Sequence, residues 1–125
     1  MLKTMDYLQL TPMDYWEGNN NSFPYVIKMD DKYVGFVLVK LIYKSIDRNY
    51  FSIAEFFILK KYRREGIGKA IAIKVFNLHK GHWEVYQKNT NRPAQIFWSK
   101  IISEYTKEQF KERFEDGKTI QNFEN

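Results

Sequence analysis

The sequence predicts an α/β or α+β fold in which helices pack on a sheet. Three observations lead to this prediction. Runs of β-branched and aromatic residues fill much of residues 24–59, which is typical of strands. Two later segments, 66–80 and 92–105, carry apolar residues at helical spacing. Short strands are expected after each of these helices, so strands alternate with helices late in the chain.

The first half of the chain predicts a sheet built around a hairpin. Thr11-Pro12-Met13-Asp14 predicts a short helix through Trp16, with Thr11 as its N-cap and Pro12 in its first turn. Residues 24–43 contain two β-rich runs around Asp30-Asp31-Lys32, which indicates a β-hairpin. Residues 50–59 form a third predicted strand.

The second half predicts two helices and two strands. The helix at 66–80 is expected to end at Gly81 as its C-terminal cap. A short strand follows at 82–86, and Pro93 stands in the first turn of the next helix, where proline is tolerated. A strand at 119–123 is expected to close the sheet. The two apolar stripes consist of Ile67, Ala70, Ile71, Val75 and Leu78, and of Ala94, Phe97, Trp98, Ile101, Ile102 and Tyr105.

The composition predicts one packed, basic domain over residues 1–125. The chain is 44% hydrophobic and 18% aromatic, which excludes a disordered protein. It has no cysteine, which excludes disulfides, thiolate nucleophiles and cysteine-ligated metals and fits a reducing compartment. The net charge of +5 favours anionic partners. Because no signal peptide or membrane-spanning run is recognised, a soluble, cytoplasmic protein is expected.

The stretch KKYRREGIGKA, residues 60–70, indicates an anion site between a strand and a helix. The first N–H groups of a helix have no intrahelical partner, and the helix dipole is positive there. Gly66 and Gly68 remove side chains, so a ligand can approach the backbone. Arg63, Arg64 and Lys69 add positive charge.

Two common phosphate motifs do not fit this stretch. A dinucleotide fingerprint needs a third glycine where Ile71 stands. A P-loop needs a glycine at the position of Arg63 and a hydroxyl residue at that of Ala70.

The remaining pattern, Arg-x-x-Gly-x-Gly, resembles the coenzyme A loop of the GNAT N-acetyltransferases. NRPAQIFW, residues 91–98, is similar to the family's Asn-x-x-Ala-x-x-aromatic-aromatic stretch. With AEFFILKKYRREGIG and GHWEV, these motifs resemble a subgroup of small predicted bacterial acetyltransferases. The resemblance implies a GNAT-like mixed, largely antiparallel sheet with splayed central strands flanked by helices. It also implies transfer of an acetyl group from acetyl-CoA (coenzyme A) to a primary amine.

The resemblance implies a set of cofactor-binding residues. In the family, the strand before the loop pairs its free backbone groups with the pantetheine arm. Asn91 matches an asparagine that hydrogen-bonds this arm, although capping of the next helix is an alternative or additional role. For the glycines the alternative is a tight turn, and for the cations a solvated face. The residues implied are Phe56, Phe57 and Ile58 on the strand, and Arg63, Arg64, Glu65, Gly66, Ile67, Gly68 and Lys69 on the loop.

Glu55 is the predicted catalytic base. Strict alternation places it on a face with apolar neighbours, where a carboxylate is costly unless it is paired and the protonated form is favoured. The resemblance puts it where several family members keep a glutamate base, which would take a proton from the acceptor amine directly or through water. The alternative is a glutamate at the sheet rim or paired with a lysine. The expected neighbours are Phe51, Ile53, Phe57 and Leu59.

Trp98 departs from the family pattern, which often has a tyrosine that protonates the departing thiolate. An indole donates a hydrogen bond but is not a useful acid. Since Trp98 lies on the apolar stripe of its helix, packing in the core is the favoured interpretation. Water is then the expected proton donor, with Tyr105 and Tyr86 as weaker candidates.

Two alternative functions stay open. One is a module of the same fold that binds coenzyme A with little or no catalysis. The other is a basic nucleic-acid-binding domain that uses Tyr62, Tyr86 and Trp98 as stacking faces and binds in a salt-dependent way.

The expected partner is a small-molecule or peptide amine, and a homodimer is the common default. The positive net charge argues against very cationic acceptors unless Glu55, Glu84 or Glu104 line the pocket. No membrane is expected. No metal site is expected either, because His79 and His82 have no cysteine or carboxylate pair beside them in the sequence.

Overall fold

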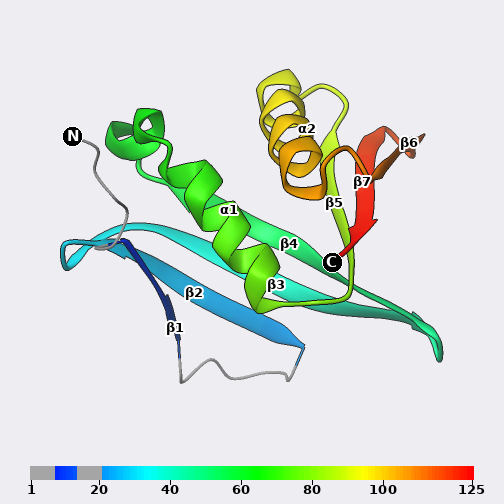
Figure 1. Cartoon of the computed structure of the whole chain (residues 1–125), viewed down its shortest axis with the longest axis horizontal. Helices are drawn as coiled ribbons and strands as arrows, with labels where there is room; N and C mark the ends of the chain where they lie inside the picture. Colours follow the sequence, from blue (N-terminus) through cyan, green and yellow to red (C-terminus); the bar gives the residue numbers. More distant parts are fainter. Residues whose placement is uncertain (1–7, 14–20) are drawn as a thin grey trace.

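The computed structural model describes residues 8–13 and 21–125, and Figure 1 shows how its strands and helices are arranged. The elements of the described residues, in chain order, are β1 (Leu8–Pro12), β2 (Ser22–Met29), β3 (Lys32–Ser45), β4 (Arg48–Ile58), the 3-10 helix η1 (Lys60–Glu65), α1 (Ile67–Leu78), β5 (His82–Lys88), α2 (Arg92–Thr106), β6 (Lys111–Glu115) and β7 (Lys118–Glu124).

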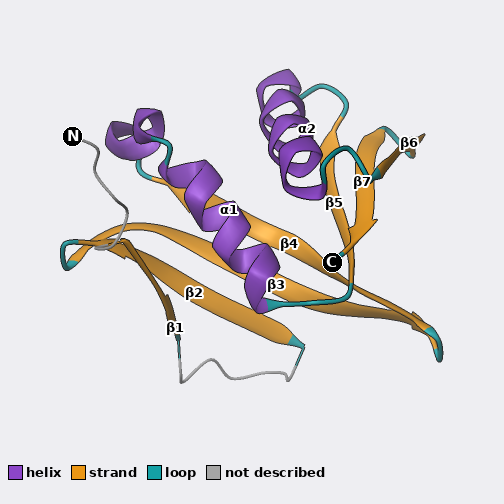
Figure 2. Cartoon of the chain, in the orientation of Figure 1, coloured by secondary structure: helices purple, strands orange, loops and turns teal. Residues whose placement is uncertain are grey.

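The strands form one sheet in the order β1-β2-β3-β4-β5-β7-β6 (Figure 2). Among the described strands, only β4 and β5 are parallel neighbours. Every other neighbouring pair is antiparallel. Helix α1 lies across β3 and β4, and α2 lies over β5 and β7. The predicted mixed, largely antiparallel sheet with flanking helices is therefore confirmed.

The predicted β2–β3 hairpin is confirmed and has a two-residue turn. Asp30 and Asp31 have φ values of 52° and 68°. Tight hairpin turns of this kind need left-handed backbone at both central positions, which aspartate tolerates better than most residues.

The N-terminal prediction is wrong where the structure describes it. Thr11 and Pro12 belong to β1, which pairs antiparallel with β2. Leu8 is buried with 3% of its surface exposed, so the strand contributes to the core. Burial against β2 outweighs the local cap signal of Thr11-Pro12, because such signals are weak beside tertiary packing. The rest of the predicted helix, Asp14–Trp16, lies outside the described residues.

Helix α1 is shorter than predicted. It ends at Leu78, and His79 is its C-cap with extended backbone. Gly81 is not the cap: it has φ 140° at the entry to β5, where its N–H donates to Asn125 Oδ1 at 2.9 Å. Leu78 is 55% exposed, so it does not belong to the buried stripe.

Strand β6 was not predicted. It pairs antiparallel with β7 through a turn at Asp116 and Gly117, whose φ values are 53° and 74°. An Asp-Gly pair between two extended runs is a hairpin signal. The charged sequence of β6, KERFE, hides that signal, because only Phe114 in it is apolar.

An aromatic cluster packs helix α1 against the middle of the sheet. Trp83 of β5 and Phe76 of α1 are fully buried, with ring centroids 4.9 Å apart. Trp83 also stacks on Phe123 of β7 at 6.3 Å. These contacts join α1, β5 and β7 where β5 meets β4. None of the helices in the described part of the chain has the length and apolarity needed to cross a membrane.

Candidate active site

The centre of the sheet opens as a V between β4 and β5. Their single paired position is Phe51 opposite Trp83, which we call the closed end of the V. From there the two strands run apart toward their C-terminal ends, as Figure 1 shows. Beyond the closed end, β4 stays paired with β3 as far as Ile58. Its other edge faces the open end of the V and offers backbone groups to a ligand.

A β-bulge in β4 changes which residues share a face. Glu55 pairs with Leu38, whereas Ile53 pairs with Val39, so Ala54 is an extra residue on β4. The extra residue reverses the alternation, and Phe56 rather than Glu55 packs inward, 5.0 Å from the Trp98 ring.

Glu55 is consequently exposed, and the prediction that it lies buried in an apolar row with Phe51 and Ile53 is wrong. Its remaining companions on that face, Phe57 and Leu59, are 49% and 41% exposed. Its role as a catalytic base stays a prediction. The base would be an exposed side chain and not a buried one.

The turn after β4 has the backbone expected of an anion site. Gly66 stands between η1 and α1 with φ 74°, a left-handed conformation that favours glycine. A Cβ at Gly66 would meet no atom within 4 Å, so the space above this residue is open. As at the start of any α-helix, the first N–H groups of α1 have no partner within their own helix.

Gly68 has a packing role as well. It is buried, and a Cβ on it would come within 3.1 Å of the Phe97 ring and 3.6 Å of Ile58 Cδ1. The second glycine of the motif therefore lets α1 lie close to α2 and β4. Direct approach of a ligand to Gly68 remains a prediction.

Two of the three predicted cations are held by other groups. Arg63 Nε donates to the Ile58 carbonyl at 2.7 Å, and its guanidinium lies 5.6 Å from the centre of the Phe57 ring. Lys69 Nζ lies 2.7 Å from Glu104 Oε1, and this contact holds the pKa of Glu104 below its usual value. The side chains of Arg64 and Glu65 lie outside the described part of the structure.

Asn91 is the N-cap of α2. Its Oδ1 accepts a hydrogen bond from the Ala94 N–H at 3.2 Å, so the predicted capping role is confirmed. The amide is exposed, so a cofactor contact remains compatible with the cap.

The tryptophan prediction is confirmed. Trp98 is 8% exposed and packs against Phe76 and Phe97, at 6.3 and 5.0 Å between ring centroids. Tyr105 donates to Asn77 Oδ1 at 2.7 Å, near the C-terminal end of α1. The other candidate acid, Tyr86, is 49% exposed beneath Lys118, whose Nζ lies 4.6 Å from the ring centre.

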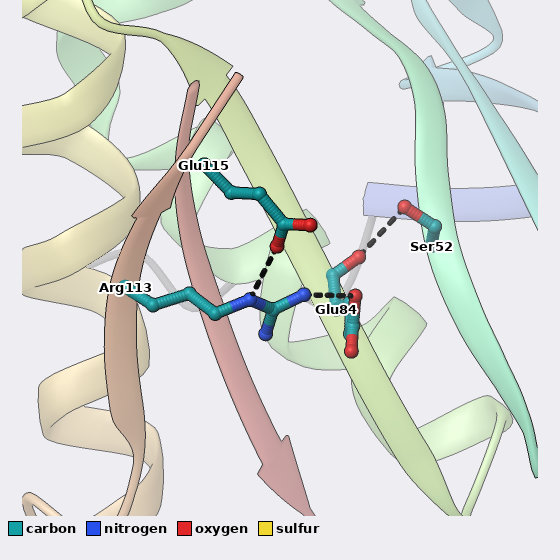
Figure 3. Close-up of polar contacts among 4 residues, drawn as sticks. All are labelled: Ser52, Glu84, Arg113 and Glu115. Carbon is teal, nitrogen blue, oxygen red and sulfur yellow. Dashed lines mark hydrogen bonds and ion pairs between the residues drawn. The ribbon is translucent and has the colours of Figure 1, made fainter. Parts of the chain in front are cut away.

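A polar network spans the closed end of the V (Figure 3). Ser52 Oγ on β4 donates to the Glu84 carbonyl on β5 at 2.7 Å. Arg113 on β6 donates to Glu84 Oε1 at 3.3 Å and to Glu115 Oε1 at 2.8 Å. Nearby Tyr50 has its pKa raised by burial and by the Glu84 carboxylate.

This network borders a pocket of about 730 Å³ between the β3–β4 hairpin and strands β5, β6 and β7. We call it the apex pocket. Its lining includes Lys44, Arg48, Tyr50, Glu84, Lys111 and Arg113. Of the three glutamates considered for an acceptor site, Glu84 lines this pocket, and Glu55 and Glu104 do not. Ser52 and Arg113 were not identified from the sequence. Arg113 lies on β6, which was not predicted, and Ser52 lies on the predicted strand β4 but contacts β5 only in the folded sheet.

The two histidines differ in environment. His79 is half-buried among aromatic rings, with Nε2 2.7 Å from Tyr25 Oη, and burial lowers its pKa. His82 is exposed, with Nε2 3.7 Å from Glu124 Oε2. The described residues include no cluster of three metal-ligating side chains.

Comparison with known proteins identifies the class. Residues 3–102 match the model of the acetyltransferase (GNAT) family, and the chain belongs to this family. A comparison with curated proteins found no match.

Solved structures of low sequence identity share the fold. An acetyltransferase from Thermus thermophilus has a TM-score of 0.63 at 15% identity, over 86% of this chain and 66% of that one. The PaiA N-acetyltransferase of Thermoplasma acidophilum, in complex with coenzyme A, has a TM-score of 0.63 at 16% identity. The match covers 84% of this chain and 62% of that one. The Bacillus subtilis N-acetyltransferase YlbP, also in complex with coenzyme A, has a TM-score of 0.58 at 18% identity. The match covers 82% of this chain and 67% of that one. The chain spans about two thirds of the length of these proteins.

Proposed function

We propose that this protein transfers an acetyl group from acetyl-CoA to a primary amine. One observation carries the proposal: an unpaired edge of β4 leads, through the short helix η1, to a left-handed glycine turn at the N-terminus of α1. An extended arm that ends in a pyrophosphate needs these two features in this order.

The residues present fit this cofactor. The pyrophosphate would lie over Gly66, where the space is open, against the N–H groups of Ile67, Gly68 and Lys69. The pantetheine arm would lie along Phe56, Phe57 and Ile58 and direct its thioester toward the closed end of the V. Arg63, Arg64 and Asn91 would border the same path. When bound, acetyl-CoA supplies an activated acetyl thioester.

The chain's own groups would then position the reaction. The amine nitrogen attacks the thioester carbonyl carbon, the C–N bond forms, and the C–S bond breaks with its electron pair on sulfur. Backbone N–H groups on β4 polarise the carbonyl oxygen. Glu55, being exposed, takes the amine proton through water, and solvent protonates the thiolate. Holding both reactants in place supplies much of the rate enhancement.

A module that binds coenzyme A without catalysis is the second candidate. The buried Trp98 favours it, because a tryptophan fills the position where a proton-donating tyrosine is often found in the family. Turnover separates the two. The chain contains no cysteine, so a thiol-specific chromogenic reagent reports released coenzyme A without background from the protein. Release that depends on an added amine supports the transferase. Tight binding of acetyl-CoA with no release across a broad amine panel would leave only the binding module.

A further inference from the structure

We propose that the apex pocket is the acceptor site and that it takes a primary amine carrying an anionic group, a carboxylate or a phosphate. This inference rests on the proposed function and adds the substrate class. It is carried by the position of the apex pocket at the closed end of the V and by the separation of charge within it.

The position of the apex pocket suits an acceptor. Tyr50 and Glu84 line it, and each is one residue from the Phe51–Trp83 pair that closes the V. A cofactor arm that enters at the open end directs its thioester toward this pair. A nucleophile bound in the apex pocket would therefore meet the thioester from the opposite side of the closed end. A volume of about 730 Å³ suits a small molecule.

Glu84 is a carboxylate of the apex pocket that is held in place by neighbouring groups. Ser52 Oγ donates to its backbone carbonyl, and Arg113 donates to its Oε1 atom. The side chain is 21% exposed, so it is held in place but still reaches solvent. A carboxylate has a second oxygen that can accept from an ammonium or amine group. We assign Glu84 to the amine end of the acceptor, as a positioning residue.

The cations of the apex pocket come from other elements. Lys44 and Arg48 extend from the β3–β4 hairpin, and Lys111 stands on β6. Within the described part of the chain, none of these three side chains forms an ion pair, whereas Arg113 is shared by Glu84 and Glu115. Three exposed cations facing one cavity are an electrostatic site for an anionic group.

The pocket is of mixed charge, and this argues for a zwitterion. Asp47 and Glu124 line it too, and Glu124 lies beside His82. A polycation would meet the unpaired cations, and a plain dianion would meet Glu84. An acceptor with one amine and one anionic group satisfies both ends.

The test uses matched amines that differ only in the anionic group. The carboxylate arm compares phenylalanine with phenylalanine amide, and the phosphate arm compares 2-aminoethyl phosphate with ethanolamine. Release of coenzyme A from acetyl-CoA is followed with each. We expect kcat/KM to be at least about tenfold higher for the charged member of one pair, the size of effect that a fixed charge contact gives. The pair that responds identifies carboxylate or phosphate.

Variants test whether the preference for a charged amine depends on residues of the apex pocket. Arg48→Ala/Lys111→Ala should remove the preference for the charged amine and raise its KM about tenfold, with kcat changed much less. Lys74→Ala/Lys80→Ala removes the same charge from exposed positions elsewhere and should keep the preference. Glu84→Gln should raise KM for both members of a pair, because it acts on the amine end.

Calorimetry separates failure of this inference from failure of the proposed function. The four amines are titrated into the protein alone and into the protein with coenzyme A. Binding of a charged amine that is lost in Arg48→Ala/Lys111→Ala, without any acetyl-CoA binding, would support the pocket and overturn the transferase. Acetyl-CoA turnover that does not distinguish the members of either pair would overturn the pocket assignment and leave the transferase in place.

Discussion

The two ends of the V present different kinds of chemical group, backbone groups at one end and side chains at the other. At the open end the groups proposed to bind the cofactor are backbone atoms: the unpaired edge of β4 and the N–H groups that follow Gly66. At the closed end the groups proposed to bind the acceptor are side chains from the β3–β4 hairpin, β5 and β6. Backbone sites serve one ligand shared by many proteins, because they need only a turn geometry. Side-chain sites can change from protein to protein while the fold stays the same.

The largest expected effect comes from truncating Trp83, the buried residue of β5 at the closed end of the V. Trp83 is fully buried against Phe76 and Phe123. Trp83→Ala should lower the free energy of unfolding by about 3–5 kcal/mol, since a large buried side chain leaves a cavity. Urea unfolding measures it. Phe114→Ala, at a residue 72% exposed, is the control and should change stability by less than about 0.5 kcal/mol. Equal losses in the two variants would contradict the packing described here.

A smaller effect should be confined to the open end. A Cβ on Gly35 of β3 would lie 2.3 Å from the Phe57 carbonyl oxygen and 2.9 Å from Ile27 Cδ1. Gly35→Ala must therefore displace β4 near the edge proposed to bind the cofactor, at a cost of about 1–3 kcal/mol. We expect weaker acetyl-CoA binding together with a lower melting temperature, while the β5–β7 half keeps its hydrogen-exchange protection. Unchanged stability and binding would show that β4 has more freedom than its pairing indicates.

Asn91 can be used to separate a cap from a cofactor contact. Asn91→Ala should cost about 1 kcal/mol of stability, because the Ala94 N–H loses its acceptor. Asn91→Ser keeps a capping oxygen and should restore most of that stability. Calorimetry of Asn91→Ser with acetyl-CoA then decides: a drop in affinity identifies a cofactor contact, and native affinity leaves Asn91 as a cap alone.

The smallest expected effect is a dependence of stability on pH. Burial lowers the pKa of His79 below its usual value of 6.5. The unfolded chain therefore binds a proton as the pH falls through about 6.5, while the folded protein does not, so stability is lost below this pH and is fully present above it. His79→Gln should flatten this loss between pH 7 and 5, and His82→Gln, at an exposed position, should not. The same slope in the native protein and His79→Gln would assign the loss to other groups.

The sequence was most informative where local chemistry decides the structure. The strand, the Gly66 turn and helix α1 follow from residue type and spacing, because a left-handed turn and an apolar stripe are local properties. The face of Glu55 could not be predicted, since a bulge at Ala54 reverses strand alternation without a glycine or proline to mark it.

The apex pocket is the clearest example of what sequence reasoning missed. Glu84 was considered only as one of three glutamates, and its partner Arg113 lies on a strand that the charge pattern conceals. Their contact depends on β6 returning beside β7, which is a property of the whole sheet. Likewise, Thr11 and Pro12 suggest a helix cap locally but pair with β2 in the fold.

The central claim is that the open end of the V holds the pyrophosphate of acetyl-CoA over Gly66. The most direct measurement is calorimetric titration of acetyl-CoA into the native protein, Gly66→Glu and Gly117→Glu. Both glycines have φ 74° and open space where a Cβ would stand, so the two variants carry the same backbone strain and the same added charge. We predict binding to the native protein and to Gly117→Glu, and a loss of at least about a hundredfold in Gly66→Glu, where the carboxylate repels the pyrophosphate. No binding to the folded native protein, or equal binding to all three, would contradict this account.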